Sequence, residues 1–496
     1  MLAAFWDILL PNVDKKRSFS LLKSLASIKL AVVIIISLGT MTAWGTFVEA
    51  RYNDAEAAAK IVYNSPLMYI IMGLFAINLM AVMIDRWPWR ERHTGFILAH
   101  IGLLTLMLGA VMTKYMGVDG SMTIGLGETT HQVVVGQTDL TLYSSMDAAK
   151  YTKIDDREVD FFRHRPTSEK PYDVMMPQGT LKVLKYFPYG LRDQKIVESG
   201  DAKTGAALRF QIQNKFVNQT EWVLQPALGR MAVKEFGPAQ ILFGKVDSID
   251  PSRNTIVLSP RGESSKDGAA DNGEIAYEIH TAHETKPTKK GIAKPGDTIQ
   301  TGWMGELVVR VLKYIPHAKE QVTFNETDQA TPLTTAAILV EFQRDAKEPK
   351  TQNWLALNSM LKLFTDQAVY ILAFANRRLD LDFNIKLEKF HVGRYEGTMT
   401  ASSYESQVNV SDIVGTKTIS MNEPLKHAGF TFYQSSFSEN ERGQPTASIL
   451  SVNRDPGRWV KYLGCLLIVF GSIHLFYFKR KTRQKPSPAA QFPVAT

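Results

Sequence analysis

The chain has 496 residues and a formal net charge of +8. Its hydrophobic residues make up 45% of the sequence, which is ordinary for a globular protein. Its apolar residues are unevenly distributed, and four stretches reach or nearly reach the roughly 20 residues needed to cross a bilayer core of about 30 Å. This distribution excludes a wholly soluble chain. Basic segments beside these stretches explain part of the charge and suit anionic lipid heads, so no nucleic-acid partner is expected.

The predicted membrane helices are three near the N-terminus and one near the C-terminus. They cover residues 28–47, 66–84, 94–113 and 459–478. None has a charged residue at its centre, where one would cost about 2.5 to 3.5 kcal/mol. A segment of 27 residues precedes the first helix, which is too long for the start of a signal peptide, so we expect this helix to be retained.

The orientation follows from lysine and arginine, which concentrate in cytoplasmic flanks. Basic residues cluster in segment 1–27, in the connection before residue 94, and in the tail 479–496. With four crossings these three segments share one side, and residues 114–458 lie on the other. We therefore expect a multi-pass protein of the bacterial inner membrane with a large extracytoplasmic domain.

The large domain is predicted to be mainly β, because short runs of alternating polarity are separated by Gly, Pro, Asn and Asp. The clearest runs are Thr180–Val183, Arg209–Gln213, Leu307–Lys313, Ala337–Phe342 and Leu381–Phe390. A polar stretch near 260–297 predicts a flexible insertion or long hairpin loops. Apolar residues at three and four spacing predict one helix in the domain, over Asn353–Arg377.

Cysteine usage limits the chemistry of the chain. The single cysteine, Cys465, falls in the fourth predicted membrane helix. An internal disulfide, a CxxC pair, a CxxCH haem-attachment site and a cysteine zinc site in the exported domain are all excluded. Any thiol chemistry around this chain must come from partners.

Histidines within the membrane are the main candidate site residues. His100 lies about 9 Å and His474 about 6 Å from the cytoplasmic face, at 1.5 Å per helical residue. His93 precedes His100 by one heptad, at the interface. An imidazole in a helix bundle suits the axial position of haem iron, but an interhelical hydrogen bond is an equally good explanation of His100.

The other histidines predict no site. His280 and His283 are close enough in sequence to share a metal, yet their loop rich in Thr and Lys favours an ordinary surface role. The sequence shows no Ser-His-Asp pattern, nucleotide-binding glycine loop or HExxH motif. No complete catalytic site is recognisable, so whether the chain is itself an enzyme stays open.

Four segments carry a family resemblance. They are LASIKLAVVIIISLGTMTAWGTF at Leu25–Phe47 with HTGFILAHIGLLTLMLGAVMT at His93–Thr113, NEPLKHAGFTFYQSSF at Asn422–Phe437, and NRDPGRWVKYLGCLLIVFGSIHLFYFKRK at Asn453–Lys481. With the order of three helices, large domain and one helix, the chain resembles the ResB family, also called CcsB, of system II cytochrome c biogenesis.

The resemblance implies one half of a cytochrome c synthetase complex. In the family, such a subunit works with a CcsA/ResC-like membrane partner to carry haem b across the membrane, where it is joined to the CxxCH thiols of apocytochrome c; thiol-disulfide reductases keep those thiols reduced. The resemblance points to His100 as a transmembrane haem ligand, with His93 second. His474 has no family counterpart and is proposed from its depth alone.

Two other functions fit the same sequence. The chain can be a scaffold that holds apocytochrome for the partner without touching haem. Whichever function holds, the Asn422–Phe437 block is expected to serve structure and docking rather than direct haem contact. The chain can also be a membrane-anchored sensor or binding module, although no cytoplasmic signalling domain is recognisable. Loss of haem on changing His100 would separate the first function from the scaffold.

Overall fold

The computed structural model describes residues 15–478 except 147–149, 202, 238, 247, 261–272, 285, 304, 399 and 441–442. The predicted basic tail 479–496, half of segment 1–27 and the first third of the insertion predicted near 260–297 lie outside these residues. The described chain divides into two compact units, one formed by the residues up to Tyr189 and from Thr327 onward, the other by Gly190–Glu326.

In the first unit, helices precede the first strand and follow the last strand along the chain. They are α2 (Lys15–Leu25), α3 (Ile28–Tyr52), α4 (Ala55–Ala58), the π-helix η1 (Ala59–Tyr63), α5 (Pro66–Asp85), the 3-10 helix η2 (Glu91–His93), α6 (Thr94–Met116), α7 (Arg458–Ile473) and the π-helix η4 (His474–Phe478). Among the described residues, four helical stretches are long and apolar enough to span a membrane: 28–52, 66–85, 91–116 and 458–478. The predicted set of three plus one is confirmed, while insertion and sidedness stay predictions.

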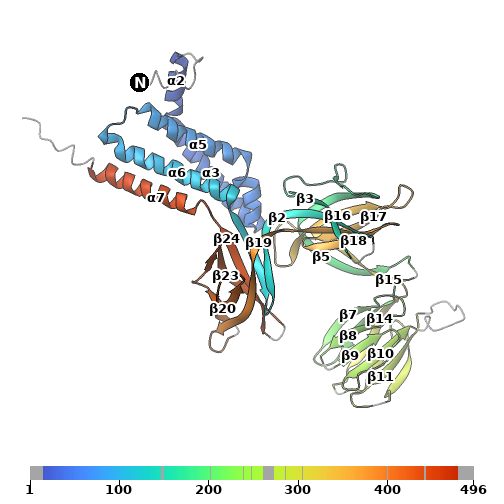
Figure 1. The fold of residues 1–496 in the computed structure, drawn as a ribbon. Coiled ribbons are helices and arrows are strands. Elements are labelled where there is room, and N and C mark those ends of the chain that lie inside the picture. The colour runs from blue at the N-terminus through green and yellow to red at the C-terminus, as the bar shows by residue number, and fades with distance from the viewer. Residues whose placement is uncertain are drawn as a thin grey trace, which may run out of the picture. The chain divides into compact units, whose positions relative to one another are not determined.

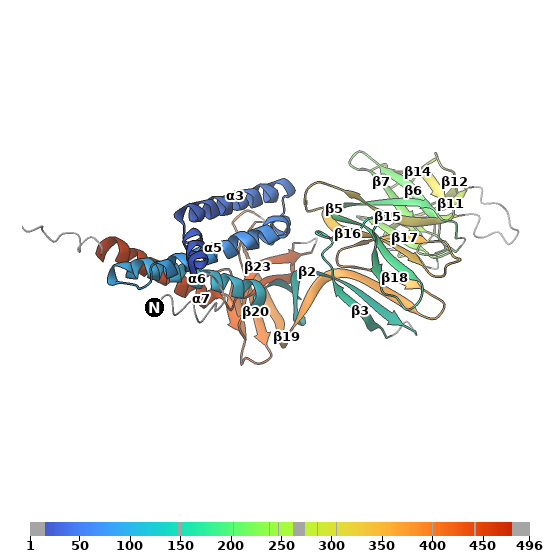
Figure 2. The same cartoon turned by 90° about the horizontal axis from the view of Figure 1, so that it is seen from above.

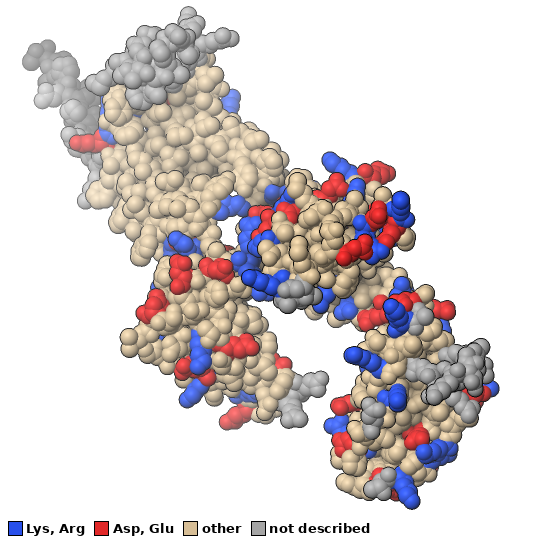
Figure 3. All heavy atoms as spheres, turned by 45° about the vertical axis from the view of Figure 1, so that its right-hand side comes forward, with Lys and Arg blue, Asp and Glu red and all other residues tan. Residues whose placement is uncertain are grey.

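The four long helices lie side by side (Figures 1 and 2). Their visible face is almost free of charged residues, in contrast to the β-rich parts (Figure 3). One buried polar group, Asn78 of α5, donates to the carbonyl of Leu25 at 2.6 Å and so joins α5 to the turn between α2 and α3. In an apolar medium such a group needs this partner, because water cannot supply one.

A seam of glycines joins α6 to α7. The glycines recur every seven residues on both helices: Gly95, Gly102 and Gly109 on α6, and Gly457, Gly464 and Gly471 on α7. A Cβ on Gly464 would lie 2.6 Å from the nitrogen of Leu106, and one on Gly457 would lie 2.0 Å from the oxygen of Gly109. The helix backbones are therefore in direct contact, which small residues alone permit.

Exposed aromatic residues gather at both ends of the four helices. One end carries Trp44, Phe47, Tyr69, Tyr115, Trp459 and Tyr462, and the other carries Trp87, Trp89, Phe476, Tyr477 and Phe478. Amphipathic rings at two levels are typical of the two interfaces of a bilayer. The level of Tyr115 and Trp459 is where the chain enters and leaves the β region.

The strands of the first unit form most of two sheets. They are β1 (Val118–Gly125), β2 (Thr129–Ser145), β3 (Thr152–Glu158), β4 (Tyr172–Val174), β5 (Thr180–Glu198), β16 (Thr334–Gln343), β17 (Thr351–Ala356), β18 (Ser359–Phe364), β19 (Val369–Arg394), β20 (Ala401–Val410), β21 (Lys417–Ser420), β22 (Leu425–His427), β23 (Phe430–Glu439) and β24 (Pro445–Arg454). The larger sheet has the order β21-β20-β19-β2-β1-β24-β23-β22, with β18 on β19 and β3 on β2.

The second unit contains the remaining strands. They are β6 (Ala207–Gln213), β7 (Asn218–Leu224), β8 (Ala232–Phe236), β9 (Ala239–Phe243), β10 (Asn254–Pro260), β11 (Ile275–His280), β12 (Lys289–Ala293), β13 (Thr298–Gln300), β14 (Val308–Ile315) and β15 (Ala318–Glu326). Two sheets, β12-β11-β10-β9-β8 and β13-β14-β6-β7, enclose a core that includes Phe210, Phe243 and Val311. The end of β5 belongs to this unit, where it pairs with β15.

Strand β19 shows why the region is β. Leu381, Phe383, Ile385 and Leu387 are buried and alternate with exposed Asp382, Lys386 and Glu388. This period of two places one face on the core and the other in solvent. Four of the five runs predicted as strands lie wholly within strands, and Leu307–Lys313 begins one residue before β14, so the mainly β domain is confirmed.

The helix predicted over Asn353–Arg377 is wrong. This segment forms β17, β18 and the start of β19, separated by a turn at Asn358 and another at residues 365–368. Asn358 adopts the left-handed conformation (φ +59°), which ends a helix but suits a tight turn. Because both faces of these strands carry apolar residues, their spacing also matched a helical pattern.

The polar stretch near 260–297 contains two ordered strands, β11 and β12, which pair antiparallel with each other. Residues 261–272 lie outside the described residues, so a flexible insertion there stays a prediction.

Candidate functional site

His100 is held on α6 by a hydrogen bond of its own helix. Its Nδ1 lies 2.8 Å from the carbonyl oxygen of Phe96, and since a carbonyl only accepts, Nδ1 carries the proton. In the neutral ring, Nε2 is then the nitrogen with the free lone pair. Histidines that bind metals commonly donate their other ring nitrogen in this way, which fixes the tautomer and the ring orientation.

The His100 ring belongs to a short stack of three side chains, with Phe96 next to it and Arg86 beyond. The ring centroids of His100 and Phe96 are 3.8 Å apart, and the guanidinium of Arg86, the residue directly after α5, lies 3.6 Å from the Phe96 centroid. No described Asp or Glu makes an ion pair with Arg86. The sequence analysis missed this stack, because its members come from two helices whose packing the sequence does not specify.

The other two predicted histidines have different surroundings. His474 stacks on Phe478 (5.4 Å between centroids), and its Nδ1 lies 3.0 Å from where a Cβ on Gly95 would be. It therefore sits on the seam side of α6. His100 follows Gly95 by five residues, about 140° further round the helix at 100° per residue, so the structure does not bring His474 to the face of His100.

His93 shares the helical face of His100 one heptad earlier but contacts its own loop. The backbone nitrogen of Arg90 lies 3.4 Å from Nδ1, and Nε of Arg92 lies 3.2 Å from Nε2. A neutral imidazole has one accepting nitrogen, so only one of these contacts is a hydrogen bond at a time. Iron ligation by any of the three histidines stays a prediction.

Metal binding elsewhere has little structural support. His280 ends β11 beside Glu278, with Nε2 3.5 Å from the carboxylate, while His283 lies in a turn with φ +68°. No group of three or more His, Cys, Asp or Glu that could hold a metal occurs in the part of the chain that the structure describes.

The connection between α3 and α5 is fixed to the β region. The nitrogen of Ala330 donates to the carbonyl of Tyr52, the Asn53 side chain donates to the carbonyl of Ala330, and Arg163 donates to the carbonyls of Lys60 and Asn64. These bonds connect a short segment between two apolar helices to residues that lie 99 or more positions away in the chain. The helices and the strands of the first unit therefore form one connected structure.

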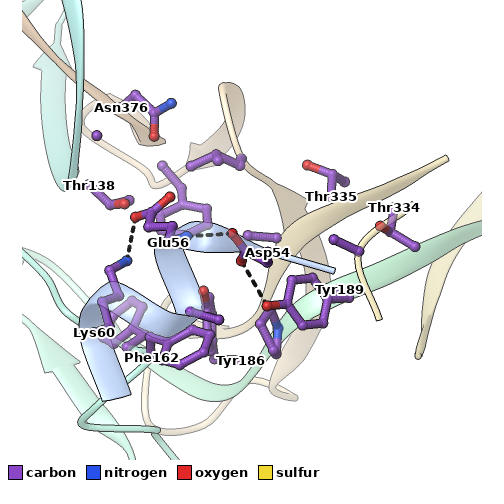
Figure 4. Close-up of a pocket in the computed structure, with 18 of the residues that line it drawn as sticks. Asp54, Glu56, Lys60, Thr138, Phe162, Tyr186, Tyr189, Thr334, Thr335 and Asn376 are labelled. Atoms are coloured by element: carbon purple, nitrogen blue, oxygen red, sulfur yellow. Dashed lines mark hydrogen bonds and ion pairs between the residues drawn. The ribbon is translucent and has the colours of Figure 1, made fainter. Parts of the chain in front are cut away.

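A cavity of 330 Å³ lies beneath this connection (Figure 4). Asp54 and Glu56 enter it from α4 and the residue before it, Lys60 pairs with Glu56 at 2.7 Å, and the hydroxyl of Tyr189 donates to Asp54 at 2.8 Å. Burial, then the bond to Asp54 and its charge, raise the pKa of Tyr189 well above its usual value. The cavity wall is thus polar, and these polar side chains are paired with one another.

Comparison with known proteins supports the family resemblance. Residues 362–450 match the model of the ResB-like family, which covers β19 to β23, the second half of β18 and the first six residues of β24. The protein NrfI of Wolinella succinogenes is 22% identical over 456 residues, which are 91% of this chain and 34% of NrfI. The chain therefore spans about a third of the length of that relative. The ResB-like match thus lies within the large sheet, and the similarity to NrfI extends along most of this chain.

Proposed function

We propose that this chain takes part in cytochrome c biogenesis and that His100 binds haem iron within the helical region. The ResB-like match supports the first part of this proposal. The observation that carries the second is the hydrogen bond from His100 Nδ1 to Phe96, which leaves Nε2 as a fixed lone-pair nitrogen. Haem here is the transported substrate, and it comes from the side where His93 and Arg86 lie.

The surroundings of His100 fit one side of a haem. Phe96 offers an aromatic surface next to the imidazole, and Arg86 offers a cation that can pair with a carboxylate of the macrocycle. We take the second axial ligand from another chain, since the family resemblance implies a haem site shared with a partner and His474 lies on a different face of α6 from His100. This assigns the opposite ligand to a CcsA/ResC-like partner, with apocytochrome c and thiol-disulfide reductases acting on the extracytoplasmic side.

The test is the haem spectrum of the detergent-purified full chain co-expressed with its CcsA/ResC-like partner. We expect His100→Ala to lose most of the bound haem and imidazole to restore it, because a free imidazole can occupy the vacated axial position. His474→Ala is the matched control, a histidine at similar depth on the seam side, and should retain haem. His93→Ala tests the second choice in the same assay.

A scaffold that holds apocytochrome without haem contact is the alternative. Unchanged haem in His100→Ala, together with unchanged cytochrome c maturation, would reject the ligand assignment and favour that scaffold. Loss of haem in both His100→Ala and His474→Ala, without rescue by imidazole, would indicate that the helix bundle had been damaged and would equally reject axial ligation by His100.

A further inference from the structure

A second and larger cavity, of 740 Å³, lies where the helices meet the β region. It is lined by the last turn of α6, by β1 and the end of β24, and by the α4–η1 segment. In Figure 1 this is the junction at which α6 continues into the strands. Neither the histidine stack nor the proposed haem transfer uses this cavity.

Most charges on the cavity wall are paired. Glu56 pairs with Lys60 at 2.7 Å, and Glu158 pairs with Arg377 at 3.1 Å. Arg163 lies 3.7 Å from the carboxylate of Asp160. Arg377 is also held by Asp139 at 2.7 Å, so it is shared between two carboxylates. These groups are engaged with one another and are not available to hold an anion.

Two further cations of the wall have no carboxylate partner among the described residues. Lys114 donates to the side-chain oxygen of Asn64, and Arg454 lies over the ring of Phe430 at 5.5 Å. They face a single further acid of the wall, Asp119. Neither a neutral amide oxygen nor an aromatic face neutralises a cation, so Lys114 and Arg454 leave their end of the cavity positively charged, which favours an anion there.

The level at which the cavity lies along the helices indicates which anion is available to it. Lys114 lies in the last turn of α6, next to exposed Tyr115, and Arg454 is followed within five residues by exposed Trp459 at the start of α7. These aromatic residues belong to the ring level typical of a bilayer interface, where phospholipid phosphates lie. The phosphate of a phospholipid can therefore reach this cavity while the lipid stays at the bilayer interface.

We infer that this cavity binds the phosphate of an anionic phospholipid through Lys114 and Arg454. The acyl chains lie along the outer ends of the helices, and the headgroup occupies the space between the last turn of α6 and the α4–η1 segment. The lipid bridges the helices and the β region at their junction. This inference does not depend on the proposed function, because it uses no histidine and no haem.

The test is native mass spectrometry of the full chain, released from nanodiscs of phosphatidylglycerol mixed with phosphatidylcholine. Wild type should keep phosphatidylglycerol, and Lys114→Gln combined with Arg454→Gln should reduce the retained lipid at least several-fold. The charge-conserving pair Lys114→Arg with Arg454→Lys should keep it. Lys362→Gln with Arg209→Gln, two exposed cations far from the helices in sequence, is the matched control.

Three outcomes would overturn the inference. Equal retention by wild type and the glutamine pair would mean that these cations do not hold the lipid, and equal loss in the control pair would mean that the effect is one of total charge. If inorganic phosphate alone raised the melting temperature as much as phosphatidylglycerol did, the cavity would be a site for free phosphate rather than for lipid.

Discussion

At the residue scale, Arg86 is the side chain whose importance only the packing reveals. Its guanidinium covers the face of Phe96, which in turn contacts His100. A cation held in this way contributes through the ring quadrupole and stays available for a carboxylate at its edge. Arg86 is therefore a positioning residue for the proposed haem and not a ligand of its iron.

We expect Arg86→Gln to weaken haem binding about tenfold, the order of a lost hydrogen bond to a charged group, while the absorbance maxima of the bound haem stay unchanged. Haem titration of the purified chain with its partner measures this. Arg86→Lys should recover part of the affinity, and Lys29→Gln, an exposed cation at the same end of the neighbouring α3, should have no effect. A change in the absorbance maxima would contradict a role away from the iron.

At the element scale, the glycine seam decides how α6 and α7 meet. The two helices are separated by more than 340 residues in the chain, yet their backbones touch at three successive levels. At the outer end Asp455 completes the contact, accepting from Thr113 at 2.6 Å and from Lys461 at 2.8 Å. Burial acts to raise the pKa of Asp455, but the bonds from Lys461 and Thr113 outweigh it and lower that pKa.

We expect Gly464→Ala to lower the melting temperature of the detergent-purified chain, because the new Cβ would lie 2.6 Å from a backbone nitrogen that cannot move aside without separating the helices. Gly73→Ala on α5 is the control. A Cβ at Gly73 meets nothing within 4 Å, so the gain in helix propensity should leave stability unchanged or slightly raised. Equal effects of the two substitutions would argue against backbone contact at the seam.

At the scale of the whole molecule, the first unit joins its helices to its strands through both chain continuity and side chains. The chain passes directly from α6 into β1 and from β24 into α7, and the α3–α5 connection is fixed by Tyr189 and Ala330. A displacement of the helices is thus transmitted to the strands of the same unit. The second unit has its own core and connects through β5 and the segment after β15.

The bond between Tyr189 and Asp54 gives this connection a pH dependence. Because the folded state raises the pKa of Tyr189, its contribution to stability is complete below the ordinary tyrosine value of about 10 and is lost as pH rises above it. We expect Tyr189→Phe to cost about 1.5–3 kcal/mol at neutral pH, since a bond to a charged acceptor is removed.

Thermal unfolding between neutral pH and pH 11 tests this prediction. The difference in melting temperature between wild type and Tyr189→Phe should shrink as pH rises, whereas Tyr395→Phe, at an exposed ring, should leave the melting temperature close to that of wild type. A difference that stays constant with pH would mean that the hydroxyl of Tyr189 does not titrate with unfolding.

The sequence by itself determined the four apolar helices, because a bilayer core demands a length of apolar residues that is visible without any tertiary contact. It also determined the strands wherever one face is polar, as in β19. It failed at residues 353–377, where both faces are apolar and the turn at Asn358 carries the only local signal. The position of His100 within a membrane span and the family resemblance predict it as a site residue. Its tautomer, however, depends on the carbonyl of Phe96, and its proximity to Arg86 depends on the packing of α5.

Only the tertiary structure could separate His474 from His100. The two histidines lie at similar depths, so sequence position alone makes them equivalent, and it is the direct contact of the α6 and α7 backbones that turns them to different faces. The cavity at Lys114 and Arg454 likewise forms between residues 340 positions apart. Such sites depend on contacts between distant segments, whereas helix length and strand alternation are local properties that the sequence states directly.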